Sequence, residues 1–123
     1  MSVSTATNSL RETLADHYAS LVTGGTTQMV FGDGGYSNGE VIDPSPEQTA
    51  LNNPLLTKAI ESHSKPDAYS VEATGRVLPS ELVGESISEA GLIVDGELVA
   101  IRNFAPKVKE NDEGYDFSVT MLF

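Results

Sequence analysis

The spacing of apolar side chains predicts a helix near the beginning of the chain. Residues 5–22 place an apolar residue every three or four positions, which is the period of a helix with one apolar face. The residues of this face are Leu10, Leu14, Tyr18, Leu21 and Val22. We expect the face to pack on a sheet of the same chain, although the same amphipathic pattern could bind a partner protein.

Candidate signals also mark the two ends of this helix. Ser9 and Glu12 have the spacing of a capping box, and a start nearer Ser4 fits equally well. Gly24-Gly25 is expected to end the helix, because glycine readily adopts the left-handed conformation that follows a last helical turn.

A short strand and a glycine-rich turn come next. Thr27, Met29 and Phe31 share one face of a strand predicted over residues 26–31. The run that follows needs either positive backbone angles or the close approach of another segment. This turn consists of Gly32, Asp33, Gly34 and Gly35.

A long polar segment separates this turn from the next strands. Residues 36–54 are rich in Ser, Asn, Pro and Gly, and we expect a loop with one helical turn over Pro46 to Leu51, since proline is tolerated at a first helical position. Long loops in compact domains usually carry function or form interfaces. The loop residues that we select as candidate interface residues are Tyr36, Pro46, Gln48, Thr49 and Leu51.

The second half of the chain reads as strands. Residues 55–63 and 68–78 are predicted to be two strands joined across residues 65–67, and residues 79–84 a short turn. Strands over 87–94 and 97–104 are expected to form a hairpin across Asp95-Gly96, one of the strongest short-range hairpin signals.

The last segment alternates most regularly. Its apolar face is formed by Tyr115, Phe117, Val119, Met121 and Phe123. The sequence ends on two apolar residues, Leu122 and Phe123, which predicts that the end of this strand is buried in its own core or against another subunit. Both are candidate interface residues, and we expect their removal to impair folding or assembly.

These elements predict one α+β domain over residues 1–123, with the N-terminal helix packed on a mainly antiparallel sheet and one long Gly/Pro/Ser/Asn loop. The chain has no cysteine, which excludes disulfides and thiolate metal sites. No basic and apolar leader opens it, and no apolar run approaches the roughly 20 residues that span a bilayer.

The charge is strongly acidic. Seven basic against eighteen acidic residues give a net charge of −11, which argues against binding nucleic acid or an anionic membrane surface. Either solubility and a basic partner, or adaptation to high salt, would account for this acidity.

No set of side chains forms a convincing reactive site. The glycine run lacks the residues of a phosphate loop, and Asp33, Glu40 and Asp43 do not follow the calcium pattern of an EF-hand, so a structural turn is the better interpretation. The two histidines, His17 and His63, do not have zinc-site spacing.

Three glutamates recur at four-residue spacing. A paired-carboxylate site is conceivable there, but we interpret them as a solvated acidic face. They are Glu81, Glu85 and Glu89. A second acidic cluster over residues 110–114 reads as a polar turn. We therefore expect no catalytic residue, no metal and no cofactor.

Several short motifs occur in a fixed order between the helix and the last strand. They are Gly32-Asp33-Gly34-Gly35, Pro46-Glu47-Gln48-Thr49-Ala50-Leu51, Val77-Leu78-Pro79, Glu89-Ala90-Gly91-Leu92, Asp95-Gly96, Leu98-Val99-Ala100-Ile101-Arg102-Asn103-Phe104 and Pro106-Lys107-Val108-Lys109. In this order they resemble the N-terminal domain of tail-collar fibre proteins of contractile-tailed phages. The resemblance covers nearly the whole chain, and the ordered set is more specific than any single motif.

Two departures from the family pattern stand out. Asn53-Pro54-Leu55-Leu56-Thr57-Lys58 replaces the Asn-Glu-Val-x-Arg-like strand of the family and adds a proline. Family fibres also continue into a repetitive shaft and a receptor-binding tip, which this sequence lacks. We therefore expect an adaptor, a baseplate plug or one chain of a split fibre; a related contractile injection machine could use the same domain.

The resemblance implies a virion structural protein, made in the host cytoplasm, that attaches a tail fibre to the baseplate and acts by assembly rather than catalysis. It implies baseplate or tail proteins as partners and a homo-oligomer, with a trimer as the expected form. The alternative is a small β domain that binds host-surface carbohydrate. That alternative would need exposed aromatic side chains, and Tyr36 and Tyr69 are the candidates, as the chain has no tryptophan.

Overall fold

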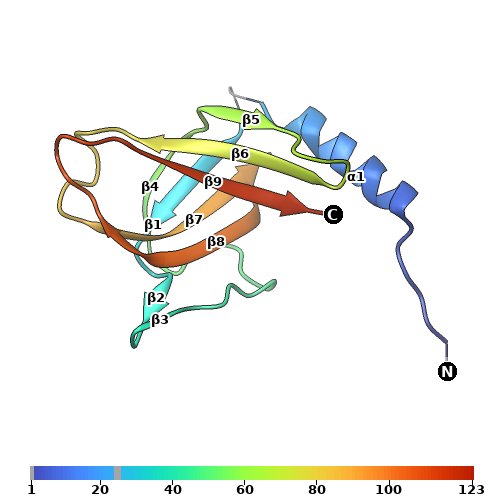
Figure 1. Cartoon of the computed structure of the whole chain (residues 1–123), viewed down its shortest axis with the longest axis horizontal. Helices are drawn as coiled ribbons and strands as arrows, with labels where there is room; N and C mark the ends of the chain where they lie inside the picture. The colour runs from blue at the N-terminus through green and yellow to red at the C-terminus, as the bar shows by residue number, and fades with distance from the viewer. Residues whose placement is uncertain (1, 24–25) are drawn as a thin grey trace.

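The computed structural model describes residues 2–23 and 26–123. Two β-sheets enclose the core, and a single helix lies along one end of the smaller sheet (Figure 1). The fold class predicted from the sequence, α+β with an N-terminal helix on antiparallel strands, is confirmed.

The larger sheet has four antiparallel strands in the order β4-β1-β7-β8. Its central strands are β1 (Gln28–Gly32) and β7 (Ser86–Val94), and its edges are β4 (Pro54–Ala59) and β8 (Glu97–Val108). The predicted hairpin across Asp95-Gly96 joins β7 to β8. Both turn residues have positive φ, 51° and 80°, as a tight two-residue turn requires.

The smaller sheet has three antiparallel strands in the order β5-β6-β9. These are β5 (Ser62–Ser64), β6 (Ser70–Val77) and β9 (Tyr115–Leu122). The predicted alternation of the last segment is confirmed, since Phe117, Val119 and Met121 are buried while the residues between them are not.

The core fills the space between the two sheets. Phe31 of β1 and Phe104 of β8 both pack on Phe117 of β9, with ring centroids 5.5 and 5.3 Å apart. Apolar residues from both sheets complete it, among them Met29, Val71, Ala73, Val77, Ile87, Ala90, Leu92 and Val119. Burial of these side chains is the main stabilising contribution.

The predicted strand over 55–63 is wrong in one respect, because the chain changes sheets within it. The Ile60 amide donates to the Thr27 carbonyl beside β1, at 3.2 Å, while the next amide, that of Glu61, donates to the Thr74 carbonyl of β6, at 2.7 Å. One continuous segment therefore pairs with both layers. An alternation of apolar and polar residues predicts an extended backbone, but not which neighbour it pairs with.

The helix α1 spans Asn8–Leu21 and begins at neither predicted position. Thr7 is the N-cap, and its side chain accepts the Leu10 amide at 3.3 Å, so neither Ser9 nor Ser4 has that role. The predicted stop at Gly24-Gly25 lies outside the described residues.

The buried face of α1 also differs from the predicted face. Ala15 and Val22 are buried and Tyr18, Ala19 and Leu21 pack partly against the core, whereas Leu10 and Leu14 remain exposed. The contacts of Arg11 account for this difference in the buried face. Its guanidinium lies 4.3 Å above the Tyr69 ring and its Nε donates to the Phe123 carbonyl at 2.6 Å, which turns this side of the helix toward the body.

The loop over 36–54 contains a hairpin that we did not predict. Strands β2 (Tyr36–Ser37) and β3 (Glu40–Val41) pair across Asn38 and Gly39, whose φ angles are 53° and 80°. The predicted helical turn is also wrong. A β-turn is present instead, in which the Gln48 amide donates to the Ser45 carbonyl at 3.1 Å.

The two last residues differ from each other. Leu122 is 82% exposed, so it is not part of the core of its own chain, and burial against another subunit is the alternative that remains open. Phe123 is partly buried and its ring stacks on Tyr18, with centroids 5.3 Å apart.

Candidate functional site

A buried carboxylate organises the segments around the glycine-rich turn. Glu89 of β7 is completely buried, and it accepts hydrogen bonds from the amides of Gly34 at 2.7 Å and of Asn52 and Asn53 at 2.9 Å. Among the described residues no cation forms an ion pair with it. The three charge-assisted hydrogen bonds therefore offset the cost of burying this charge.

This geometry corrects the interpretation of Glu81, Glu85 and Glu89 as one solvated acidic face. Of the three only Glu85 is exposed, while Glu81 accepts the Lys58 ammonium at 2.6 Å and the Leu78 amide at 2.8 Å. The hydrogen bond from Lys58, followed by that from the backbone, holds the pKa of Glu81 below its usual value. The three side chains serve separate segments, so they do not form a paired-carboxylate site.

The glycines of the turn are required by close packing. A Cβ on Gly34 would lie 2.6 Å from the Asn52 Cβ, and one on Gly35 would overlap the Ser88 carbonyl. Positive φ, the other explanation that we considered for this run, is not found there. Since the Gly34 and Gly35 amides donate to Glu89 and Ser88, they are not free to bind a phosphate.

Further polar contacts fix the rest of the loop from inside. The Asn52 amide group donates to the Gly34 carbonyl at 2.9 Å, and that of Asn103, from β8, donates to the Ile42 carbonyl at 2.8 Å. The Ile42 amide donates in turn to the Gly35 carbonyl at 2.9 Å. The loop is therefore attached to β7 and β8 at both ends and in the middle.

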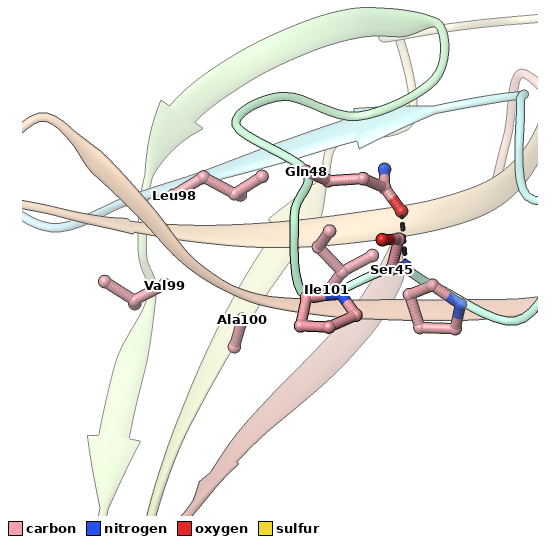
Figure 2. Close-up of a pocket in the computed structure, with 8 residues that line it drawn as sticks. Ser45, Gln48, Leu98, Val99, Ala100 and Ile101 are labelled. Atoms are coloured by element: carbon pink, nitrogen blue, oxygen red, sulfur yellow. Dashed lines mark hydrogen bonds between the residues drawn. The ribbon is translucent and has the colours of Figure 1, made fainter.

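The outer surface of the loop carries a shallow pocket over β8. Prolines and Gln48 from the loop face four consecutive aliphatic residues of the strand, around a cavity of about 310 Å³ (Figure 2). Its lining consists of Pro44, Ser45, Pro46, Gln48, Leu98, Val99, Ala100 and Ile101. Gln48 braces the turn, because its Oε1 accepts the Ser45 amide at 2.8 Å and its Nε2 donates to the Ala50 carbonyl at 3.1 Å.

The predicted interface residues of the loop occupy different environments. Tyr36, Pro46 and Thr49 are exposed, Gln48 is partly exposed, and Leu51 is only 5% exposed. The side chain of Leu51 thus contributes to the packing of the loop and has almost no surface to offer a partner. Tyr36 lies on the β2–β3 hairpin, Pro46 lies within the β-turn over residues 45–48, and Thr49 directly follows that turn.

Other chemistry considered from the sequence finds no support in the geometry. Over residues 2–23 and 26–123 no cluster of three or more His, Asp or Glu side chains could hold a metal ion. His17 lies on α1 and His63 on β5, both exposed. The only helix in the described part of the chain is too short and too polar to cross a membrane.

The aromatic residues that a carbohydrate site would need are not together. Tyr36 lies on the β2–β3 hairpin, and the ring of Tyr69 is covered by the guanidinium of Arg11 near α1. The geometry therefore describes a rigid, internally braced loop surface without a reactive centre among the described residues.

The sequence motifs identified the turn but not the residue that holds it. The sequence places Asn103 only within a motif and Glu89 within a motif and a row of three glutamates, and neither pattern reveals the role as a loop anchor, since the partners are backbone groups far away in the sequence. The Asn38-Gly39 pair was a usable hairpin signal within the loop.

Residues 1–122 match the family model described as "Phage tail-collar fibre protein, N-terminal". No curated protein matches the chain.

Proposed function

The chain belongs to the phage tail-collar fibre protein family through its N-terminal domain, and on that basis we propose that it attaches a tail fibre to the baseplate or acts as an adaptor at the tail tip. Membership makes it a structural protein of a phage tail, located in the virion tail in contact with other tail proteins. The proposed role needs only assembly, with binding surfaces presented on one stable domain that spans residues 1–123.

The observation that carries this proposal is the braced loop surface. The amides held by Glu89 and the contact of Asn103 with Ile42 fix the loop before any partner arrives. A preorganised loop loses little conformational entropy on binding, which favours a stable contact over a transient one. Tyr36, Pro46 and Thr49 are its exposed members, and we assign to them the contact with a neighbouring tail protein.

We further propose that the protein acts as a homo-oligomer, with a trimer as the expected form. Copies arranged around a symmetry axis would match the symmetry of a tail and its fibres. Leu122 supports this proposal, since a leucine that is 82% exposed in the isolated chain becomes buried if a second copy covers it.

The test is to ask where the chain lies in purified phage particles and which surface keeps it there. Cryo-electron microscopy is expected to show its density at the baseplate or tail tip. Particles assembled with the Tyr36→Arg and Thr49→Arg variants should contain at least about tenfold fewer copies by quantitative mass spectrometry, because a bulky charge at a contact residue costs well over 1 kcal/mol.

Val83→Arg is the matched control. Val83 is exposed, as Tyr36 and Thr49 are, with 49% of its surface accessible, but it lies on the turn at residues 79–84, away from the loop. All variants should melt at the temperature of the wild type, so that a loss of copies reports binding. Absence of the wild-type chain from particles, or normal incorporation of both loop variants, would overturn the proposal.

A further inference from the structure

A groove opens where the two sheets diverge, and both of its sides are strand edges. The strands β8 and β9 are edges of their own sheets, and neither pairs with the other. The Arg102 side chain donates to the Ser118 carbonyl at 3.1 Å where they are close. Beyond this point, the first half of β8 and the end of β9 line a groove of about 410 Å³, which we call the β8–β9 groove.

The groove offers apolar side chains beside backbone groups that the strand ladder leaves unpaired. Its β8 side consists of Glu97–Ile101 and its β9 side of Thr120–Phe123. Leu122 at its rim is 82% exposed. An edge strand flanked by apolar side chains is a template for the addition of another extended segment.

The same chain contains an extended segment of the kind that adds to a strand edge. Residues 2–7 precede α1 as an extended arm that points away from the body, and all six are exposed (Figure 1). Val3 is 86% exposed. The arm contains no charged residue, and its β-branched residues Val3, Thr5 and Thr7 alternate along it, as in a strand.

The lengths of the arm and the edge agree. Six extended residues span about 20 Å, and the five residues of β8 along the groove span about 17 Å. The helix after the arm adds two exposed apolar side chains, Leu10 and Leu14, at 49% and 38% exposure. Within the described part of the chain, neither the arm nor the groove has a partner, and the two match in length.

We propose that the arm of one copy adds as a strand to the β8–β9 groove of a second copy. The charge of the chain favours this mode of contact. Each copy carries a net charge of −11, so a broad contact between two bodies is opposed by repulsion, whereas an uncharged arm brings only neutral residues into the neighbouring groove. Each copy offers one arm and one groove, so the contact can repeat from copy to copy, and under a three-fold rotation it closes a trimer; reciprocal exchange between two copies would close a dimer instead. This inference rests on the homo-oligomer of the proposed function and specifies how its copies join.

Two single substitutions test the contact from both sides. Val3→Asp on the arm and Leu122→Asp at the groove alter exposed side chains, so the fold should be unchanged by circular dichroism and melting. In sedimentation velocity each should weaken self-association by at least about tenfold, because a carboxylate would have to be buried among apolar groups. Val83→Asp is the control and should associate like the wild type.

Cross-linking then identifies the pair, since the chain has no cysteine of its own. Val3→Cys and Leu122→Cys are prepared as separate proteins, mixed and oxidised; the mixture should give a disulfide-linked pair that neither protein gives alone. A double variant should give covalent multimers. If it instead gives a monomer with an internal disulfide, the arm occupies its own groove and the inference is overturned.

The possible results distinguish the arm contact from the homo-oligomer on which it rests. An oligomeric wild type whose association survives both substitutions keeps the proposed homo-oligomer and overturns the arm contact. A monomeric wild type at high concentration, with and without high salt, overturns both. Location of the chain in the particle is measured separately and depends on neither result.

Discussion

At the scale of single residues, the motifs that mark this family resemblance are internal braces. Glu89 of the Glu-x-Gly-Leu motif holds three loop amides, and Asn103 of the Asn-Phe motif holds the Ile42 carbonyl. Lys109, which closes the Pro-x-x-Lys motif, is buried, and its ammonium donates to the carbonyls of Pro79 and Glu110 at 2.9 and 2.7 Å. Glu89 and Asn103 thus hold the loop from inside, whereas Lys109 fixes the turn at residues 79–84.

Replacing Glu89 tests this role directly. Glu89→Gln keeps the shape of the side chain but turns an amide group toward at least one backbone donor, so one hydrogen bond becomes a donor–donor contact. We expect the free energy of unfolding to fall by about 1–3 kcal/mol. Hydrogen exchange at the amides of Gly34, Asn52 and Asn53 should become faster.

Glu85→Gln provides the control, since the Glu85 side chain is exposed. It should change stability by less than about 0.5 kcal/mol. Equal stability and unchanged amide exchange in Glu89→Gln would show that the buried carboxylate does not hold the loop.

The ion pair between Lys58 and Glu81 predicts a pH dependence. The pKa of Glu81 is lowered from 4.5 in the folded protein, so its contribution to stability is present above pH 4.5 and disappears as the pH falls through the lower folded value. We expect wild type to exceed Glu81→Gln in stability at pH 7 and to lose this advantage in acid.

Urea unfolding of both proteins between pH 7 and pH 3 measures the difference. The comparison must be made between variants, because the pKa of Asp67 is also lowered, chiefly by the Tyr69 amide and the Ser70 hydroxyl, and contributes to acid unfolding of every variant. A difference that stays constant down to pH 3 would contradict the assignment.

At the scale of elements, sequence patterns predicted correctly those elements whose structure depends on signals within their own residues. The β7–β8 hairpin follows from Asp95-Gly96, and β9 follows from its strict alternation. The hairpin at Asn38-Gly39 had a signal of the same kind, which the surrounding serines and prolines obscured. The burial of Glu89 had no local signal, because the amides that it accepts come from residues that only the fold brings close.

The end of β9 provides a prediction at this scale. Phe123→Ala removes a partly buried ring that stacks on Tyr18 and should lower stability by about 1–2 kcal/mol, less than the loss for a fully buried phenylalanine. Leu122→Ala should leave the stability of the monomer within about 0.5 kcal/mol. Thermal unfolding in dilute solution measures both.

This pair of variants tests, for each terminal residue separately, the expectation that the end of β9 is buried. A large loss of stability in Leu122→Ala under monomeric conditions would mean that the leucine is covered by its own chain. Equal stability of Phe123→Ala and wild type would mean that the contact with Tyr18 does not hold the helix to the sheet.

At the scale of the whole molecule, two different kinds of surface emerge. The loop surface is fixed by internal hydrogen bonds before binding, whereas the arm and the β8–β9 groove leave extended backbone without a partner. The first suits recognition of a neighbouring tail protein, and the second suits the joining of copies. The net charge of −11 opposes nonspecific contact between free copies.

The segment that changes sheets at Ile60 and Glu61 has a mechanical consequence. The segment from β4 to β5 forms hydrogen bonds with both sheets, so pulling on one sheet also loads the hydrogen bonds of the other along the same backbone. Tension applied to the fold would therefore be distributed over both sheets at once. We expect the two sheets to resist rupture as a single unit.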